Sequence, residues 1–164
     1  MKKLIFTALL ATAVAQAGVL GNSVDFDDVP ETAAGDVFMV KPSKFSVNET
    51  VKRFTIIAKQ KGFTIFTVID HQKNAKNAGL KMGEEKVIIF GNPKGGTMLM
   101  NKDPRIGLDL PLKVLVYKDK GGVKLIYKKA QSLTRDYDVA GHIVLIKMAN
   151  IMARFANYAT KAAL

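Results

Sequence analysis

The stretch that decides the fold is KVIIFGNPKGGTMLMNKDPRIGLDLPL, residues 86–112. It opens as an apolar strand over residues 86–90, breaks at glycines and a proline, and reaches a second strand that begins at Leu112. Glycine adopts backbone conformations that other residues avoid and lets a ligand approach the backbone closely. Segments that leave a strand also carry a large share of binding residues. We therefore expect a candidate site at residues 91–97.

The segment before this stretch predicts a helix followed by a strand. Ser46 and Glu49 form a capping box, and Gly62 supplies the expected left-handed stop. Between them, apolar residues recur at helical spacing. Residues 63–70 are β-branched and aromatic and alternate between two faces, which predicts a strand. Residues 71–79 are polar and predict one or two helical turns that end at Gly79.

The remaining elements complete an α+β order. A first strand is expected over residues 36–40, ended by Pro42 because proline cannot donate to a ladder. Residues 112–118 and 123–127 flank a glycine-bearing turn and predict a hairpin. A long amphipathic helix is expected over residues 143–163. Such an order places helices on one face of a mostly antiparallel sheet. The other face needs cover, for which a homodimer is the simplest solution.

Three segments resemble a bacterial family known as domain of unknown function 302. They are the runs IDH at residues 69–71, IFGNPKGGT at 89–97 and DLPLKVLVY at 109–117. The resemblance covers about residues 41–133. It implies a β-α-β(4)-α fold like one half of the TATA-binding protein, and it implies dimers. It does not imply an activity, and its architectural likeness to a DNA-binding protein says nothing about DNA.

The N-terminus reads as an export signal. Two lysines precede an apolar run and a small-residue cleavage site, AQA at 15–17, so residues 1–17 are expected to be a signal peptide and the protein periplasmic. Residues 18–35 form an acidic, extended lead-in, and residues 36–164 a single domain. No membrane span is expected in the mature chain, because the apolar run is shorter than the ~20 residues that cross a bilayer.

Composition limits the chemistry of the site. The chain has no cysteine, which excludes disulfides and thiolate metal sites, and a formal net charge of +11. A basic surface suits an acidic partner, anionic lipid or simple solubility. The predicted export argues against nucleic acid, and the lysines are scattered as on an ordinary solvated surface.

The run from Gly91 to Thr97 is the first candidate site. Asn92 is expected to donate or accept hydrogen bonds, Lys94 to meet negative charge, and the amides of residues 95–97 (Gly95, Gly96 and Thr97) to cradle a small anion ahead of a short helix from Thr97. It is not a phosphate-binding P-loop, because that pattern needs a lysine directly before the threonine and here Gly96 precedes Thr97. The alternative is a strand-to-helix turn that needs glycine only for its dihedral angles.

A second candidate site joins His71 to methionines. His71 ends a strand, where it could be a metal ligand, a haem ligand or a general base, and Met98 and Met100 could supply thioethers for copper or haem. Covalent c-type haem is not expected, since the chain lacks cysteine. The alternatives are a structural histidine and methionines that fill the core.

Together these features favour an exported binding or accessory module over an enzyme. The expected site is a pocket between His71 and residues 92–97 that takes a small anion or other ligand. Another periplasmic protein is a further possible partner. The alternatives are a haem- or copper-binding protein and a hydrolase that depends on His71. The hydrolase requires the fold to bring His71 to a loop acid, for example Asp103, Asp109, Asp136 or Asp138.

Overall fold

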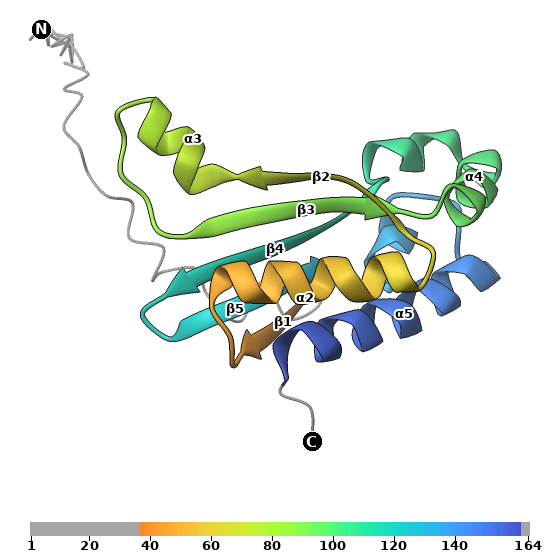
Figure 1. The fold of residues 1–164 in the computed structure, drawn as a ribbon. Coiled ribbons are helices and arrows are strands. Elements are labelled where there is room, and N and C mark those ends of the chain that lie inside the picture. The colour runs from red at the N-terminus through yellow and green to blue at the C-terminus, as the bar shows by residue number, and fades with distance from the viewer. Residues whose placement is uncertain (1–36, 162–164) are drawn as a thin grey trace, which may run out of the picture.

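The computed structural model describes residues 37–161, which form a five-stranded antiparallel sheet with helices (Figure 1). The strand order is β1-β5-β4-β3-β2. The strands are β1 (Phe38–Ser43), β2 (Thr64–Asp70), β3 (Glu85–Gly91), β4 (Leu112–Asp119) and β5 (Gly122–Lys128). The α-helices are α2 (Val47–Gln60), α3 (His71–Asn77), α4 (Pro93–Lys102) and α5 (Ile143–Thr160). Two 3₁₀ helices, η2 (Pro104–Leu108) and η3 (Ala130–Arg135), lie between them.

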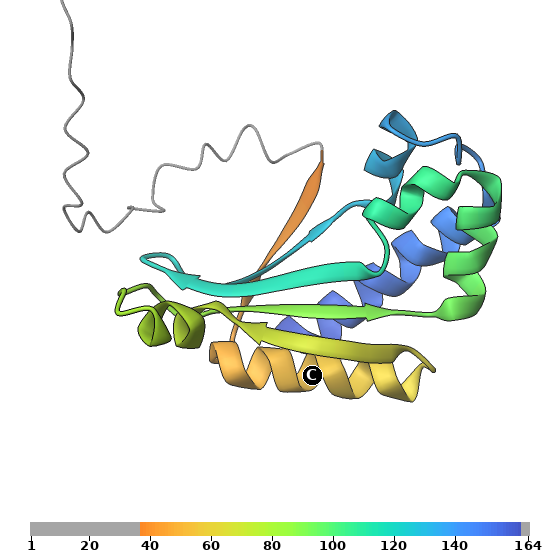
Figure 2. The ribbon, with the colours of Figure 1, turned by 90° about the horizontal axis from the view of Figure 1, so that it is seen from above.

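The α+β class and the β-α-β(4)-α order expected from the sequence are confirmed. The helices α2 and α5 lie on the same side of the sheet, as the view from above shows (Figure 2). The expected signal peptide and acidic lead-in lie outside the described residues. The expected domain boundaries stay predictions.

Sequence signals explain most element boundaries. The Ser46 hydroxyl accepts a hydrogen bond from the Glu49 amide and caps α2. Gly62 follows α2 with φ +76°, the left-handed conformation expected of a helix stop. The hairpin between β4 and β5 pairs Asp119 with Gly122, as its glycine-bearing turn predicts.

Two details of the strands differ from expectation. Pro42 lies within β1, opposite Lys124 of β5. Because β1 is an edge strand, the missing proline N–H can fall on its unpaired side. The strict alternation expected over residues 63–70 is also wrong, since the register of β2 shifts between Ile65 and Thr67. Such a bulge re-aims the side chains around it, here Phe66.

The main core fills the space between the sheet and the helices α2 and α5. Four phenylalanines form its centre, with the rings of Phe54 and Phe90 5.0 Å apart and those of Phe63 and Phe155 5.3 Å apart, both near edge-to-face. The long C-terminal helix therefore packs within its own chain, against α2 and the sheet.

A second cluster packs the α4 end of the molecule. Its buried members come from α4, the two 3₁₀ helices, residue 139 and the start of α5: Leu99, Ile106, Ala130, Leu133, Val139 and Leu145. Two carboxylates tie its surface together. Asp103 accepts hydrogen bonds from Arg105 and from the Asp138 amide, and Asp109 accepts them from Lys128 and the Tyr137 hydroxyl.

Candidate functional site

The glycine-rich run does not form the expected anion cradle. Helix α4 begins at Pro93 rather than Thr97, and Asn92 is its N-cap. The Asn92 side-chain oxygen accepts hydrogen bonds from the amides of Lys94 (3.0 Å) and Gly95 (3.4 Å), and its carbonyl accepts one from Gly96 (2.9 Å). These amides therefore have partners inside the protein. The alternative, a strand-to-helix turn, is right in that β3 leads directly into α4. It is wrong in requiring glycine dihedral angles, because Gly91, Gly95 and Gly96 do not have a positive φ.

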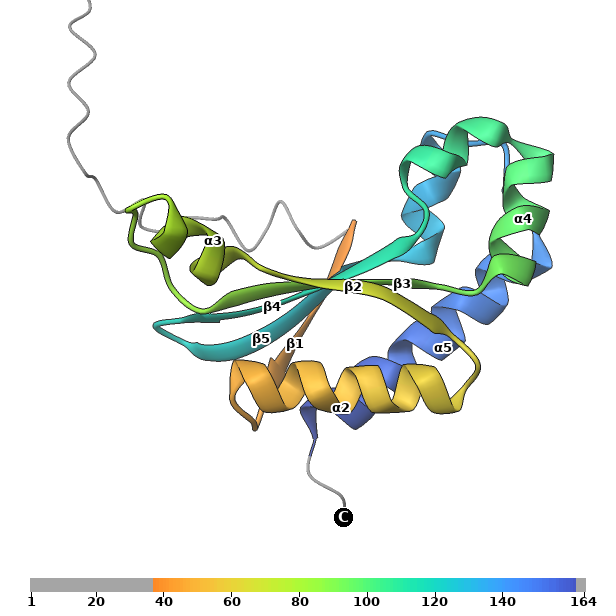
Figure 3. The same ribbon diagram turned by 45° about the horizontal axis from the view of Figure 1, so that its top comes forward.

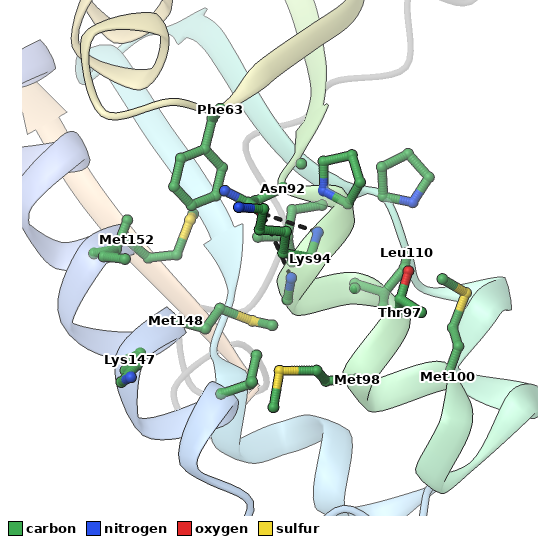
Figure 4. A pocket seen from close by; sticks show the side chains of 18 of the residues that line it. Phe63, Asn92, Lys94, Thr97, Met98, Met100, Leu110, Lys147, Met148 and Met152 are labelled. Atoms are coloured by element: carbon green, nitrogen blue, oxygen red, sulfur yellow. Dashed lines mark hydrogen bonds between the residues drawn. The ribbon is translucent and has the colours of Figure 1, made fainter.

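The same residues nevertheless line a pocket of about 670 Å³. We name it the α4–α5 pocket, because those two helices form opposing walls (Figure 4). The start of β2, the end of β3 and residues 110–112 complete it. All six residues from Asn92 to Thr97 line it, together with the following apolar side chains: Phe63, Phe66, Met98, Met100, Leu110, Pro111, Leu112, Val144, Met148, Ile151 and Met152. A pocket of this size and lining is typical of small-molecule sites.

The two walls meet where Gly95 of α4 lies beside Val144 of α5. A Cβ built on Gly95 would lie 3.5 Å from the Val144 side chain of α5. This is an ordinary van der Waals distance, so an alanine would also fit there. The Asn92 side chain donates to the Gly62 carbonyl (3.4 Å) beyond the end of α2. These contacts place the beginning of α4 between α2 and α5.

The charged residues among the pocket lining are all lysines: Lys61 after α2, Lys94 in the first turn of α4, and Lys147 on α5. Among residues 37–161, no aspartate or glutamate lines the pocket. The ammonium groups therefore give its mouth a positive potential that no lining carboxylate offsets.

The two methionines expected to act as ligands do not converge. Residues two positions apart on a helix differ by about 200° in direction. Met98 extends toward Met148 of α5, whereas Met100 lies on the other side of α4 (Figure 4). There, a Cβ on Gly107 would lie 3.7 Å from the Met100 sulfur.

His71 lies at the opposite end of the sheet from this pocket. It starts α3, next to Asp70, which pairs with Lys86 at the beginning of β3, whereas Asn92 follows the end of β3. Figure 3 shows α3 and α4 at the two ends of the β2–β3 pair. At about 3.3 Å per residue, the strands separate the two ends by about 20 Å. The expected single pocket between His71 and residues 92–97 is therefore wrong, and so is the pairing of His71 with Met98 or Met100.

The neighbours of His71 have structural roles. The Asp70 carboxylate caps α3 by accepting from the Lys73 amide (2.8 Å) and pairs with the Lys86 ammonium (2.8 Å). The hydrogen bond from Lys86, supported by that from the Lys73 amide, lowers the pKa of Asp70. Asp70 is thus a helix cap held as a carboxylate.

The loop acids do not assemble a hydrolytic site. Hydrogen bonding from Arg105 holds the pKa of Asp103 well below its usual range. Asp109 is engaged by Lys128 (2.9 Å) and the Tyr137 hydroxyl (3.0 Å), and both acids lie at the α4 end, away from His71. Within residues 37–161, no three His, Cys, Asp or Glu residues lie close enough together to hold a metal ion.

Sequence reasoning missed most of the pocket walls. Most of the pocket residues on α5 belong to the apolar face of that helix, and an apolar face by itself predicts only packing against the sheet. Phe66 was assigned to an ordinary strand position and reaches the pocket at the β2 bulge. Only the tertiary arrangement brings these residues to the 91–97 run.

Comparison with known proteins identifies the family. Residues 39–155 match the domain of unknown function DUF302. The chain belongs to this family. A crystal structure of an uncharacterized conserved DUF302 protein from Bacillus stearothermophilus has the same fold, with a TM-score of 0.68 and 20% identity. The alignment covers 74% of this chain and 97% of that one.

Part of this DUF302 chain is also similar to larger proteins. An 80-residue stretch is 46% identical to fluoride-specific ion channel FluC 1 of Brucella suis biovar 1, covering 49% of this chain and 32% of the relative. The FluC 1 protein of Brucella abortus biovar 1 matches equally over 80 residues, 30% of its length. The chain thus spans about a third of the curated relatives it matches. Among its described residues, no helix has the length and apolarity that crossing a membrane requires.

Proposed function

We propose that this DUF302 protein is a binding module that holds a small apolar molecule in the α4–α5 pocket. The observation that carries the proposal is the pocket itself, about 670 Å³, lined mainly by aromatic, aliphatic and methionine side chains. Methionine side chains are flexible and polarizable, so they adapt to ligands of irregular shape. A binding role also agrees with the partners of two loop acids, since Asp103 is bound by Arg105, and Asp109 by Lys128 and Tyr137.

Nile red, a neutral dye that fluoresces in apolar surroundings, tests the proposal directly. We expect the unmodified protein to bind it and raise its fluorescence. Met98→Trp should reduce that rise, because Met98 is 49% exposed and extends into the pocket, so a larger side chain there fills space without disturbing the core. Leu108→Trp is the matched control, since Leu108 is 83% exposed and does not line the pocket. Equal dye binding by all three proteins would contradict the proposal.

Haem is a second candidate ligand of the same pocket. Met98 and Met148 extend toward each other across it, and a thioether is a known axial ligand of haem iron. Visible absorbance of the protein purified from its export compartment tests this alternative. A haem band that Met98→Leu or Met148→Leu shifts would favour haem, and a spectrum without such a band would leave the neutral apolar ligand.

We also propose export and a homodimer. Export rests on the signal-peptide pattern of residues 1–17, and N-terminal sequencing of the secreted protein would test it. The homodimer rests on the face of the sheet turned away from α2 and α5, where β1 presents Phe38 and Val40, both about two-fifths exposed. Val40→Lys should then convert a dimer to a monomer in light scattering, and a wild-type monomer would contradict it.

The similarity to proteins named fluoride-specific ion channels supplies another alternative, an accessory module that responds to fluoride. Thermal unfolding in sodium fluoride and in sodium chloride at equal ionic strength separates the two ions. Stabilisation by fluoride alone would favour the accessory role, and equal melting temperatures would count against it.

A further inference from the structure

We infer that the ligand of the α4–α5 pocket is a single-chain amphiphile with an anionic head group, the chemistry of a fatty acid. This inference rests on the proposed function and adds the ligand class. Three lysines from three separate parts of the chain line the otherwise mainly apolar pocket: Lys61, Lys94 and Lys147. A purely apolar ligand would leave them without a role, whereas an anionic head group would pair with them.

Burial changes with depth in the pocket, as an amphiphile requires. Its inner wall includes Met152, which is buried, and half-buried Phe63, Ile151 and Met148, all of which pack against the main core. The three lysines are exposed. An ionised group is strongly disfavoured in the apolar interior, so the head group would stay with the lysines while the chain displaces water from the methionines and Phe63.

Several basic residues elsewhere in the described chain are paired with carboxylates, whereas other exposed lysines, such as Lys59 and Lys76, form no ion pair. Ion pairs with carboxylates engage Lys52, Lys86, Lys102, Arg105, Lys124 and Lys128. Within residues 37–161, Lys61, Lys94 and Lys147 make no ion pair with a protein carboxylate. Their charge therefore stays available to a bound anion. Their aliphatic stems can also extend along the apolar lining while the ammonium groups remain in water.

The start of α4 adds to the same field. Helix N-termini carry a partial positive charge that stabilises anions within about one turn. Lys94 lies in that first turn. Because Asn92 already satisfies the nearby amides, this contribution is a potential at the mouth rather than direct hydrogen bonds to the ligand.

Competition with Nile red tests the inference using twelve-carbon ligands that differ only in their head group. Dodecanoate and dodecyl phosphate carry an anion, dodecanol is neutral, and dodecyltrimethylammonium is cationic. All are used below the concentration at which they form micelles. We expect dodecanoate to displace the dye at about tenfold lower concentration than dodecanol, because two or three exposed ion pairs act together. Raising the salt concentration should narrow this difference. The phosphate arm shows whether the site prefers a carboxylate.

A charge-neutralised variant identifies the residues responsible. Lys94→Gln with Lys147→Gln should weaken dodecanoate about fivefold and leave dodecanol unchanged. The matched control is Lys73→Gln with Lys76→Gln on α3, which makes the same change in net charge at the other end of the sheet. Both lysine pairs are exposed, so both variants are expected to fold.

A second substitution introduces a negative charge into the pocket. Met98→Glu should weaken dodecanoate far more than dodecanol, whereas Met98→Gln should affect both ligands alike. Dye binding with equal displacement by all head groups would overturn the anionic class and leave the proposed function standing. Absence of dye binding to the unmodified protein would overturn both.

Discussion

Phe155→Ala is the substitution that tests most directly how α5 is held to the rest of the protein. Phe155 is 2% exposed, and its ring lies 5.8 Å from that of Phe54 and 5.3 Å from that of Phe63, edge-to-face with both. The same helix supplies the pocket wall that carries Lys147 and Met148. Loss of this anchor should therefore reduce both stability and dye binding.

The expected loss of unfolding free energy is large. Truncation of a buried phenylalanine to alanine costs about 3–5 kcal/mol, because the transferred area and the remaining cavity both contribute. Phe155→Leu keeps most of the volume and loses the ring contacts, each of about 0.5–1.5 kcal/mol, so we expect about 2 kcal/mol. Domains have a net stability of about 5–15 kcal/mol, so the alanine variant is expected to fold but with little margin.

Urea unfolding followed by far-UV circular dichroism measures these losses. With a slope of about 1.5 kcal/mol per molar urea, Phe155→Ala should lower the midpoint by about 2–3 M. Ile146→Ala on the same helix is the control, because Ile146 is largely exposed and should change stability by less than about 0.5 kcal/mol. A midpoint shift for Phe155→Ala no larger than that of Ile146→Ala would refute the assignment of Phe155 to the core.

Three further predictions concern single residues. Asn92→Ala should lower the free energy of unfolding by about 1 kcal/mol through loss of the α4 cap, while Asn92→Asp should retain most of it; equal losses in urea titrations would contradict capping. Gly62→Ala should cost about 1 kcal/mol because φ is +76°, and an unchanged melting temperature would contradict this. Asp103 has a lowered pKa in the folded state, chiefly through the hydrogen bond from Arg105, so its contribution is present above the unfolded pKa of about 3.9 and is lost as the pH falls below it. The stability difference between wild type and Asp103→Asn should therefore shrink as the pH falls from about 6 to about 3. A constant difference would contradict this assignment.

The fold could be predicted from local signals where those signals are strong. A capping residue and a left-handed glycine bracket α2, and the turn at residues 119–122 defines the β4–β5 hairpin. Each depends on interactions within a few residues, so the sequence contains all the information needed. The β2 bulge at Phe66 depends instead on how β2 pairs with β3, which alternation of apolar residues alone cannot show.

Only one side of the candidate site, residues 91–97, was predicted; the other walls and the chemistry were not. The run at residues 91–97 lines the pocket, but glycine was interpreted as a source of free amides. In the structure, the Asn92 side chain accepts hydrogen bonds from the amides of Lys94 and Gly95, so these amides are not free for a ligand. An asparagine directly before a proline is a helix N-cap signal, because asparagine caps helices and proline is favoured at the first helical position. Asn92 and Pro93 therefore indicate a helix start at Pro93.

The separation of His71 from the pocket follows from topology that the sequence leaves open. His71 follows β2 and Asn92 follows β3, and in a parallel pair these two strand ends would meet at one edge of the sheet. The two strands are antiparallel, so their ends point in opposite directions. The connection at residues 71–84 is long enough for either arrangement, because parallel neighbours need a crossover of about a dozen or more residues, so its length does not decide the direction of pairing. The direction of β3 also locates the pocket. The end of β3 pairs with the start of β4 at Leu112, and Asn92, just after β3, contacts Gly62 beyond the end of α2. A ligand bound there is therefore selected by residues 61–63, 91–98 and α5. Those residues supply apolar surface and lysines rather than imidazole and carboxylate, which favours selection by shape and charge over catalysis.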